Sequence, residues 1–460
     1  RVLFRSKRNI ITYKNTFKKK LVMLKKTILS HDFRHTAINQ LWRLFSGPAL
    51  LILIPLYITA EVQGYWYTFI SLAALAVFAD MGFSTILLQF SAHEFAHLKF
   101  ESDKTIGGNK KHLERLASLL RFAMKWAGSI GVVAFPIILF IGFIILNQKE
   151  TEINWIIPWI IYGLASSLIF VNSMLLSFIE GCDSVGDIQK IRFYISFITV
   201  LSTVTLLVCG TELYALVLSL FIGAITGIVL IFIKYHKMLK QLYDIGLKVF
   251  YDWKVEILKL IGKYSISWIS GYFIFYIFTP IAFTYKGVVE SGQIGLTIAV
   301  FTAIFGISNI WMTIIIPKIN MLVSKRDYET LDQIFMRHLF LSIVTYILGV
   351  ITLFIIVLFF KDYVPFDERL VSPFSLMIIS IVWLLQIVVQ GLAYYMRAHK
   401  EEPLVIPSFV SGIYVSLTTL FVATYLPFEY FFLGFLSSYI WGIPWVLIIF
   451  RKYKGGNKWK

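Results

Sequence analysis

The residues His93, Glu94 and His97 have the spacing H-E-x-x-H. On a helix, this spacing places two imidazoles one turn apart with a carboxylate beside them, as in zinc proteases. A catalytic zinc also needs a third protein ligand. The best candidates, Glu180 and Asp183 in FIEGCDSVGD, fit no such motif well. We therefore expect a polar helix end with two solvated imidazoles and no metal, with an intramembrane zinc protease as an alternative.

Two charged residues lie within apolar stretches, where ionisable groups are costly and therefore functional candidates. Asp80 lies in VFADMGF and Arg43 in NQLWRLFSGP. We expect both at similar depth on adjacent antiparallel helices, where they can form a charge-assisted pair. The pair either locks the two helices together or orients Arg43 toward a cavity, where its fork suits a phosphate or pyrophosphate. Lys263 is the candidate counterpart in the second half of the chain.

Polar side chains within other apolar stretches are further candidates for binding a substrate. Asn172, Gln386 and Gln390 could line a hydrophilic path or bridge helices. Arg397 closes the inner end of a stretch, as a topology anchor or as a ligand. No G-x-S-x-G elbow, Walker A loop or other catalytic constellation is present. The sequence therefore predicts a transporter without a cofactor rather than an enzyme.

The elements that must position these residues are transmembrane helices. The 460 residues are 58% hydrophobic and 15% charged, with a mean hydropathy of +0.76. This composition predicts an all-α, polytopic membrane protein. Twelve stretches are long enough to cross ~30 Å of hydrocarbon, at about 36–60, 65–90, 123–147, 155–179, 191–209, 213–233, 261–284, 293–316, 339–360, 371–396, 404–425 and 429–450.

The distribution of basic residues predicts how the helices are oriented. Of 43 Lys and Arg residues, four fall in the loops assigned to the outer side, and the other 39 lie at the inner side. The positive-inside rule then places both termini in the cytoplasm. We attribute the net charge of +17 to basic residues that orient the helices and contact anionic lipids of the inner leaflet. We therefore do not expect nucleic-acid binding. In the basic segment 1–35, we expect Met23 to be the natural start.

The spans divide into two groups of six. We expect an N-terminal bundle at 36–233, a cytoplasmic amphipathic linker at 234–260, a C-terminal bundle at 261–450 and a basic cytoplasmic tail at 451–460. The two bundles look like weak copies. GYWYTFISLAALAVFADMGFSTILLQF, which begins at Gly64, resembles GLTIAVFTAIFGISNIWMTIIIPKINM, which begins at Gly295. Such repeats occur in transporters that bind a substrate between two halves.

The region 41–96 resembles the opening of bacterial O-antigen and polysaccharide flippases, which belong to the multidrug/oligosaccharidyl-lipid/polysaccharide (MOP) exporter superfamily. The resemblance rests on Pro55, the Gly-aromatic pair at 64–65 and the run DMGFS at 80–84. The region 263–319 matches the seventh and eighth spans of that family.

The resemblance implies a V-shaped pair of six-helix bundles around a central cavity in the bacterial inner membrane. The implied activity is flipping of an undecaprenyl-pyrophosphate-linked oligosaccharide to the periplasmic leaflet by alternating access, with polysaccharide polymerase machinery as a partner. Cationic residues in the cavity would hold the pyrophosphate and sugar; Arg43 matches by position and Asp80 by motif. GYFIFYIFTPIAF lacks the mid-span acid of many relatives, which puts ion coupling there in doubt. A cation-coupled drug exporter of the same superfamily is the alternative.

Overall fold

A computed structural model describes residues 31–359, 366–399 and 401–454. Almost all of this part is helical. One short hairpin pairs β1 (Leu98–Phe100) with β2 (Ile106–Gly108). The helices are α2 (His31–Tyr57), α3 (Ala60–Ala73), η1 (Ala74–Ala76), α4 (Val77–Asp80), α5 (Phe83–Phe95), α6 (Lys110–Leu146), α7 (Ile156–Gly181), α8 (Val185–Val208), α9 (Leu213–Lys248), α10 (Lys254–Phe275), α11 (Phe278–Tyr285), α12 (Val288–Lys325), α13 (Tyr328–Phe359), α14 (Phe366–Arg369), α15 (Pro373–Arg397), α16 (Val405–Tyr425), η2 (Phe428–Tyr430) and α17 (Leu433–Arg451).

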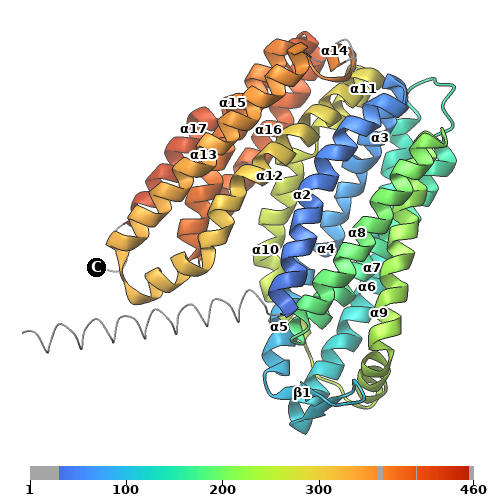
Figure 1. Ribbon diagram of the computed structural model, residues 1–460, viewed down its shortest axis with the longest axis vertical. Coiled ribbons are helices and arrows are strands. Elements are labelled where there is room, and N and C mark those ends of the chain that lie inside the picture. The colour runs from blue at the N-terminus through green and yellow to red at the C-terminus, as the bar shows by residue number, and fades with distance from the viewer. Residues whose placement is uncertain (1–30, 360–365, 400, 455–460) are drawn as a thin grey trace, which may run out of the picture.

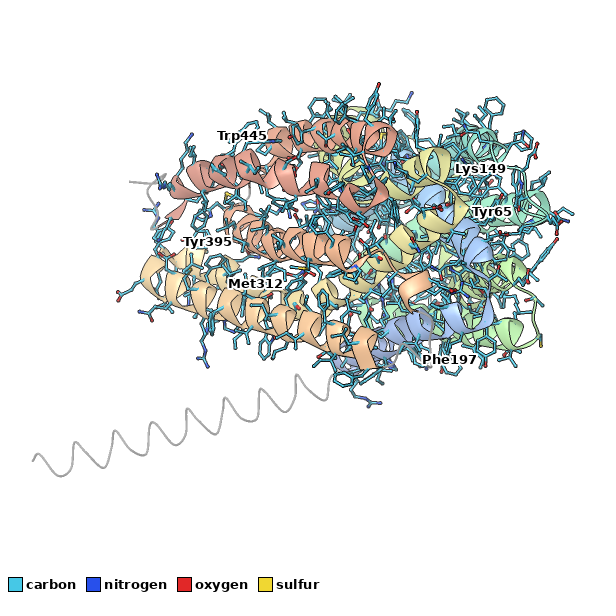
Figure 2. All side chains as sticks on the ribbon, turned by 90° about the horizontal axis from the view of Figure 1, so that it is seen from above. Tyr65, Lys149, Phe197, Met312, Tyr395 and Trp445 are labelled. Atoms are coloured by element: carbon cyan, nitrogen blue, oxygen red, sulfur yellow. The ribbon has the colours of Figure 1, made fainter. Side chains whose placement is uncertain are left out.

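The helices confirm the predicted all-α membrane fold. In the described part of the chain, eleven helices are long and apolar enough to cross a membrane, and there are twelve if the bent pair α10–α11 is counted as one span. One hydrophobic core fills the first half, α2 to α9, and extends to Ile257 of α10 and Leu296 of α12. A second core lies within the second half, α10 to α17. The halves approach each other at the upper end of Figure 1, where α3 and α11 lie, and diverge toward the lower end. Figure 2 shows them side by side, with Tyr65 in one half and Tyr395 in the other.

The seventh span is bent because of its proline. Helices α10 and α11 meet at 42°. Pro280 has no N–H to donate to the carbonyl of Tyr276 four residues earlier, and proline inside a helix therefore kinks it. The carbonyl of Tyr276 instead accepts a hydrogen bond from Ser71 of α3.

The predicted amphipathic linker at 234–260 is helical to Lys248 but is continuous with the sixth span. Helix α9 continues without interruption to Lys248, and a short connection leads to α10 at Lys254. The basic and apolar residues that alternate after the apolar segment therefore continue the helix of the sixth span to Lys248. Its apolar face packs within the first half, where Met238 and Leu242 are fully buried.

Candidate functional site

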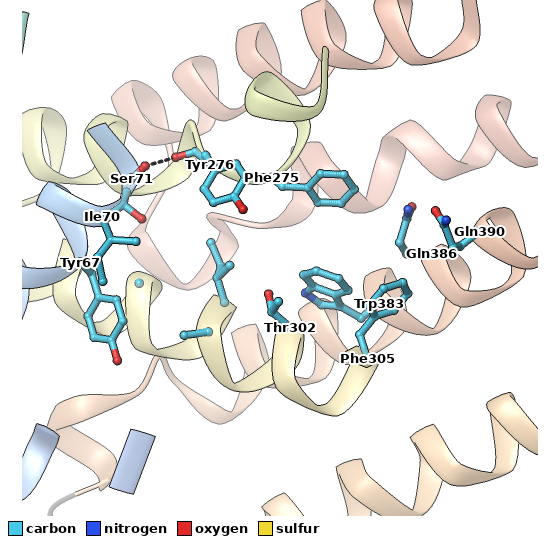
Figure 3. Close-up of a pocket in the computed structure, with 14 residues that line it drawn as sticks. Tyr67, Ile70, Ser71, Phe275, Tyr276, Thr302, Phe305, Trp383, Gln386 and Gln390 are labelled. Carbon is cyan, nitrogen blue, oxygen red and sulfur yellow. Dashed lines mark hydrogen bonds between the residues drawn. The ribbon is translucent and has the colours of Figure 1, made fainter. Parts of the chain in front are cut away.

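A cavity of about 460 Å³ lies between the two halves. Its lining comes from α3 of the first half and from α10, α11, α12 and α15 of the second half. The lining residues are Tyr67, Ile70, Ser71, Phe275, Tyr276, Thr279, Gly295, Ile298, Ala299, Thr302, Phe305, Trp383, Gln386 and Gln390 (Figure 3). Its volume is typical of a ligand pocket, about 300–1,000 Å³.

The lining of this interlobe cavity is aromatic and neutral. Trp383 stacks on Phe275 with ring centroids 5.8 Å apart and packs against Phe305 at 5.2 Å. Gln386 accepts a 2.7 Å hydrogen bond from the hydroxyl of Tyr439 through Oε1, which leaves its amide nitrogen as a donor. No Lys, Arg, His, Asp or Glu of the described residues lines the cavity. Such a surface suits uncharged rings that carry hydroxyl or amide oxygens.

The cavity is sealed at one end by backbone contact between α3 and α12. We call the end where both helices begin the closed end and the opposite end the open end. A Cβ atom on Gly64 would lie 2.1 Å from the carbonyl oxygen of Val288, and one on Gly295 would lie 2.1 Å from Cβ of Tyr67. These glycines are required because small residues let membrane helices approach closely. Gly64 begins one of the two segments that resemble each other in the sequence, and Gly295 begins the other. The first glycines of the two repeats therefore lie at the same interface.

Hydrogen bonds join the halves at the closed end. Gln63 donates from Nε2 to the carbonyl of Gly292 at 3.0 Å, and the hydroxyls of Thr68 and Ser291 lie 3.0 Å apart. Arg369 donates from Nη2 to the carbonyl of Ile58 at 2.7 Å. Burial lowers the pKa of Arg369, and the charge of Glu368 opposes this shift.

A second cavity of about 200 Å³ lies inside the second half, among α10, α15, α16 and α17. Gln386 and Gln390 line both this cavity and the interlobe cavity. Arg397 lines the second cavity and also a third one of about 350 Å³ at the open end. Positions 386, 390 and 397 are four and seven residues apart and share one face of α15. A polar stripe therefore runs along α15 from the interlobe cavity to the open end.

The expected pair of Arg43 and Asp80 does not form. The carboxylate of Asp80 accepts hydrogen bonds from the backbone N–H of Ser84 at 3.1 Å and from its hydroxyl at 2.6 Å. It caps α5 after a break in the second span, where Met81 has φ 45° and Gly82 has φ 79°. Asp80 is thus used locally, because the break supplies free N–H groups.

Arg43 and Lys263 lie on the first helix of their respective halves. Arg43 is exposed on α2 and lines none of the three cavities. Helix α2 packs against α8, where Asn39 donates to Gln189 at 2.8 Å and Trp42 donates to Ser196 at 3.1 Å. Lys263 falls in α10, and its side chain lies outside the described part of the structure. Among the described residues, the interlobe cavity therefore lacks the cationic side chains expected from the sequence.

The structure separates the remaining candidates into two groups. Asn172 is buried and donates from Nδ2 to the carbonyl of Ala224 at 2.7 Å, so it bridges α7 and α9 within the first half. Gln386, Gln390 and Arg397 lie on the polar stripe. Ser71 was not among the predicted site residues, because a lone serine in an apolar helix commonly bonds its own backbone and gives no signal of a cavity.

The H-E-x-x-H stretch does not form a metal site. Helix α5 ends at Phe95, so His93 and His97 do not lie on one helical face. Glu94 is buried and is held by Nδ1 of His112 and Nε of Arg115, each at 2.8 Å. Among the described residues, no group of three His, Cys, Asp or Glu side chains could hold a metal ion. Glu94 therefore has a structural role, and the geometry gives no support to a zinc protease.

No family model matches the sequence, and no curated protein matches it. The structure is similar to that of an inward-facing multidrug resistance MATE family transporter of the MOP superfamily, with a TM-score of 0.58 and 14% identity over 90% of this chain and 95% of that one. A MOP superfamily transporter from Pyrococcus furiosus gives 0.51 and 13% over 94% and 96%. An outward-facing MATE family transporter gives 0.50 and 14% over 92% and 96%. These similarities show the fold, two six-helix halves arranged as in these transporters.

Proposed function

We propose that this protein is a transporter that flips an oligosaccharide linked to undecaprenyl pyrophosphate across the bacterial inner membrane by alternating access. The observation that carries the proposal is the interlobe cavity, which both halves line and which the contact of α3 with α12 seals at one end. A site between two halves that separate at alternate ends is the geometry that alternating access requires.

The chemistry of the lining favours a sugar as the group that enters the cavity. The exposed ring of Tyr276 and the amides of Gln386 and Gln390 match sugar rings and their hydroxyl groups. A neutral lining can accept the uncharged parts of the substrate. The anionic pyrophosphate requires a cation outside this cavity.

The predicted orientation assigns the open end to the cytoplasm. The closed end then faces the periplasm, and the structure represents an inward-facing state. The higher TM-score with the inward-facing than with the outward-facing transporter supports this assignment. In this orientation, a substrate assembled in the cytoplasmic leaflet has access to the cavity, and the polysaccharide polymerase machinery would receive it on the other side.

Proteoliposomes test the proposal. We expect the full chain to transfer a fluorescent polyprenyl-diphosphate disaccharide between leaflets, measured with a membrane-impermeant quencher and compared with protein-free vesicles. Failure to transfer this lipid would contradict the proposal. The same vesicles loaded with ethidium test the alternative, an exporter of drugs, which the apolar lining and the fold also support. Movement of ethidium without movement of the lipid would establish the alternative instead.

A further inference from the structure

The third cavity, at the open end of the second half, contains two arginines from separate elements. Arg326 comes from the turn between α12 and α13, and Arg397 is the last residue of α15. Asn320 and Ser324 add neutral hydrogen-bonding groups to the same cavity of about 350 Å³. We propose that this cavity binds a phosphate group through Arg397 and Arg326, and that Glu402 occupies the fork of Arg397 when no phosphate is bound.

The contacts of Arg397 show what ligand its guanidinium accepts. Nε of Arg397 lies 3.0 and 2.9 Å from the two carboxylate oxygens of Glu402, and Nη2 lies 2.7 Å from one of them. A phosphate presents two oxygens in the same bidentate arrangement and carries more negative charge. The pair is partly open to water, with side-chain exposures of 40% and 28%. Because the pair is open to water and a phosphate carries more negative charge than a carboxylate, an incoming phosphate can displace Glu402.

Two other carboxylates at this end are engaged elsewhere. Asp327 accepts from the backbone N–H of Thr330 at 3.2 Å, at the beginning of α13. Asp332 accepts from the hydroxyl of Tyr395 at 2.8 Å. No carboxylate of the described residues lies within 4.0 Å of the charged nitrogens of Arg326. Glu402 is therefore the competitor that the structure identifies for this site.

The place of the cavity identifies the source of the phosphate. Gln386 and Arg397 are eleven residues apart on α15, which is about 16 Å at 1.5 Å per residue. Neutral sugars in the interlobe cavity and a charged phosphate at Arg397 are compatible with one elongated, lipid-linked molecule. This assignment to a lipid diphosphate rests on the proposed function, whereas the phosphate site itself does not.

Calorimetry on the full chain in detergent, with inorganic pyrophosphate as the probe, tests the site. We expect Arg397→Gln to weaken binding by about tenfold or more, because it removes a charge-assisted bidentate contact. Glu402→Gln should tighten binding by about threefold or more, because it removes the competing carboxylate. Arg337→Gln is the matched control, since Arg337 is exposed on α13 and lines none of the three cavities. Equal effects of Arg397→Gln and Arg337→Gln, or weaker binding to Glu402→Gln, would overturn the proposal.

Nanodiscs distinguish the possible sources of the phosphate. A polyprenyl diphosphate in the disc should compete with pyrophosphate at Arg397, and phosphatidylglycerol should compete at least tenfold less well. Equal competition would overturn the assignment to a lipid diphosphate and indicate a site for anionic headgroups in general. Pyrophosphate binding as expected without lipid transfer in proteoliposomes would contradict the proposed function alone. Lipid transfer with no effect of Arg397→Gln on binding would contradict this site alone.

Discussion

Replacing Gly295 by alanine should destabilise the closed end. The added methyl group would lie 2.1 Å from Cβ and 2.5 Å from Cγ of Tyr67, whereas carbon atoms pack at about 3.5–4.0 Å. Helix α12 has little room to shift along α3, because the two backbones are also in close contact one turn away. There, a Cβ atom on Gly292 would lie 2.8 Å from the backbone nitrogen of Gly64. Helices α3 and α12 must therefore separate.

The size of the effect follows from the cost of overpacking. Inserting a methyl group into a packed interface costs about 1–3 kcal/mol. Only the state in which α3 contacts α12 bears this cost, so the equilibrium between closed and separated ends should shift by about fivefold to about a hundredfold. The helix-forming advantage of alanine over glycine, about 1 kcal/mol, is common to both states and does not alter their ratio.

The separation can be measured by the reactivity of a cysteine at the interface. Ser291 is fully buried beside Thr68, so Ser291→Cys reacts with a maleimide only when the ends part. The exposed Cys209 is replaced by serine, and the buried Cys182 remains. Gly306→Ala is the matched control on the same helix, because nothing lies within 4 Å of its added Cβ. We expect faster labelling with Gly295→Ala and no change with Gly306→Ala; equal labelling rates would refute the role of Gly295.

Three further changes have expected outcomes. Pro280→Ala restores an N–H that the carbonyl of Tyr276 can accept, so spin labels at the two ends of the seventh span should move apart as its bend relaxes. Arg369→Gln removes the hydrogen bond to Ile58, and the interface cysteine should label about fivefold faster, for a loss of about 1 kcal/mol. Glu94→Gln removes the carboxylate that pairs with the half-buried Arg115, which should lower the free energy of unfolding by about 1–3 kcal/mol; a zinc chelator should leave the melting temperature unchanged.

The positions of the spans could be predicted because they depend on the length of apolar stretches. The breaks within the spans could not be predicted, because hydropathy averages over many residues and contains no information on backbone dihedral angles. The break after Asp80 needs left-handed conformations at Met81 and Gly82, and only the glycine is a residue that commonly signals one. Asp80 was therefore expected to pair with Arg43 on an adjacent helix, whereas its partner is Ser84, four residues away.

The candidate site was predictable where a polar side chain interrupts an apolar helix. Gln386 and Gln390 were identified in this way and line the cavity. Asn172 gives the same signal but bridges two helices, since the sequence does not show which face of a helix meets a cavity and which meets a neighbour. Trp383 and Phe275 are chemically ordinary members of a chain that is 17% aromatic. Their role emerges only when α10 and α15 are brought together.

The seal of the closed end and the shape of the cavity depend on each other through Ser71. This residue lines the cavity and donates to the carbonyl of Tyr276, which Pro280 leaves without its helical partner. Separation of α3 from α12 would break this bond and leave the carbonyl without a donor from the protein. The bend between α10 and α11 must then change, or a hydroxyl of the substrate must replace that of Ser71. Either response alters the cavity wall as the end opens, so access and binding are coupled at this carbonyl.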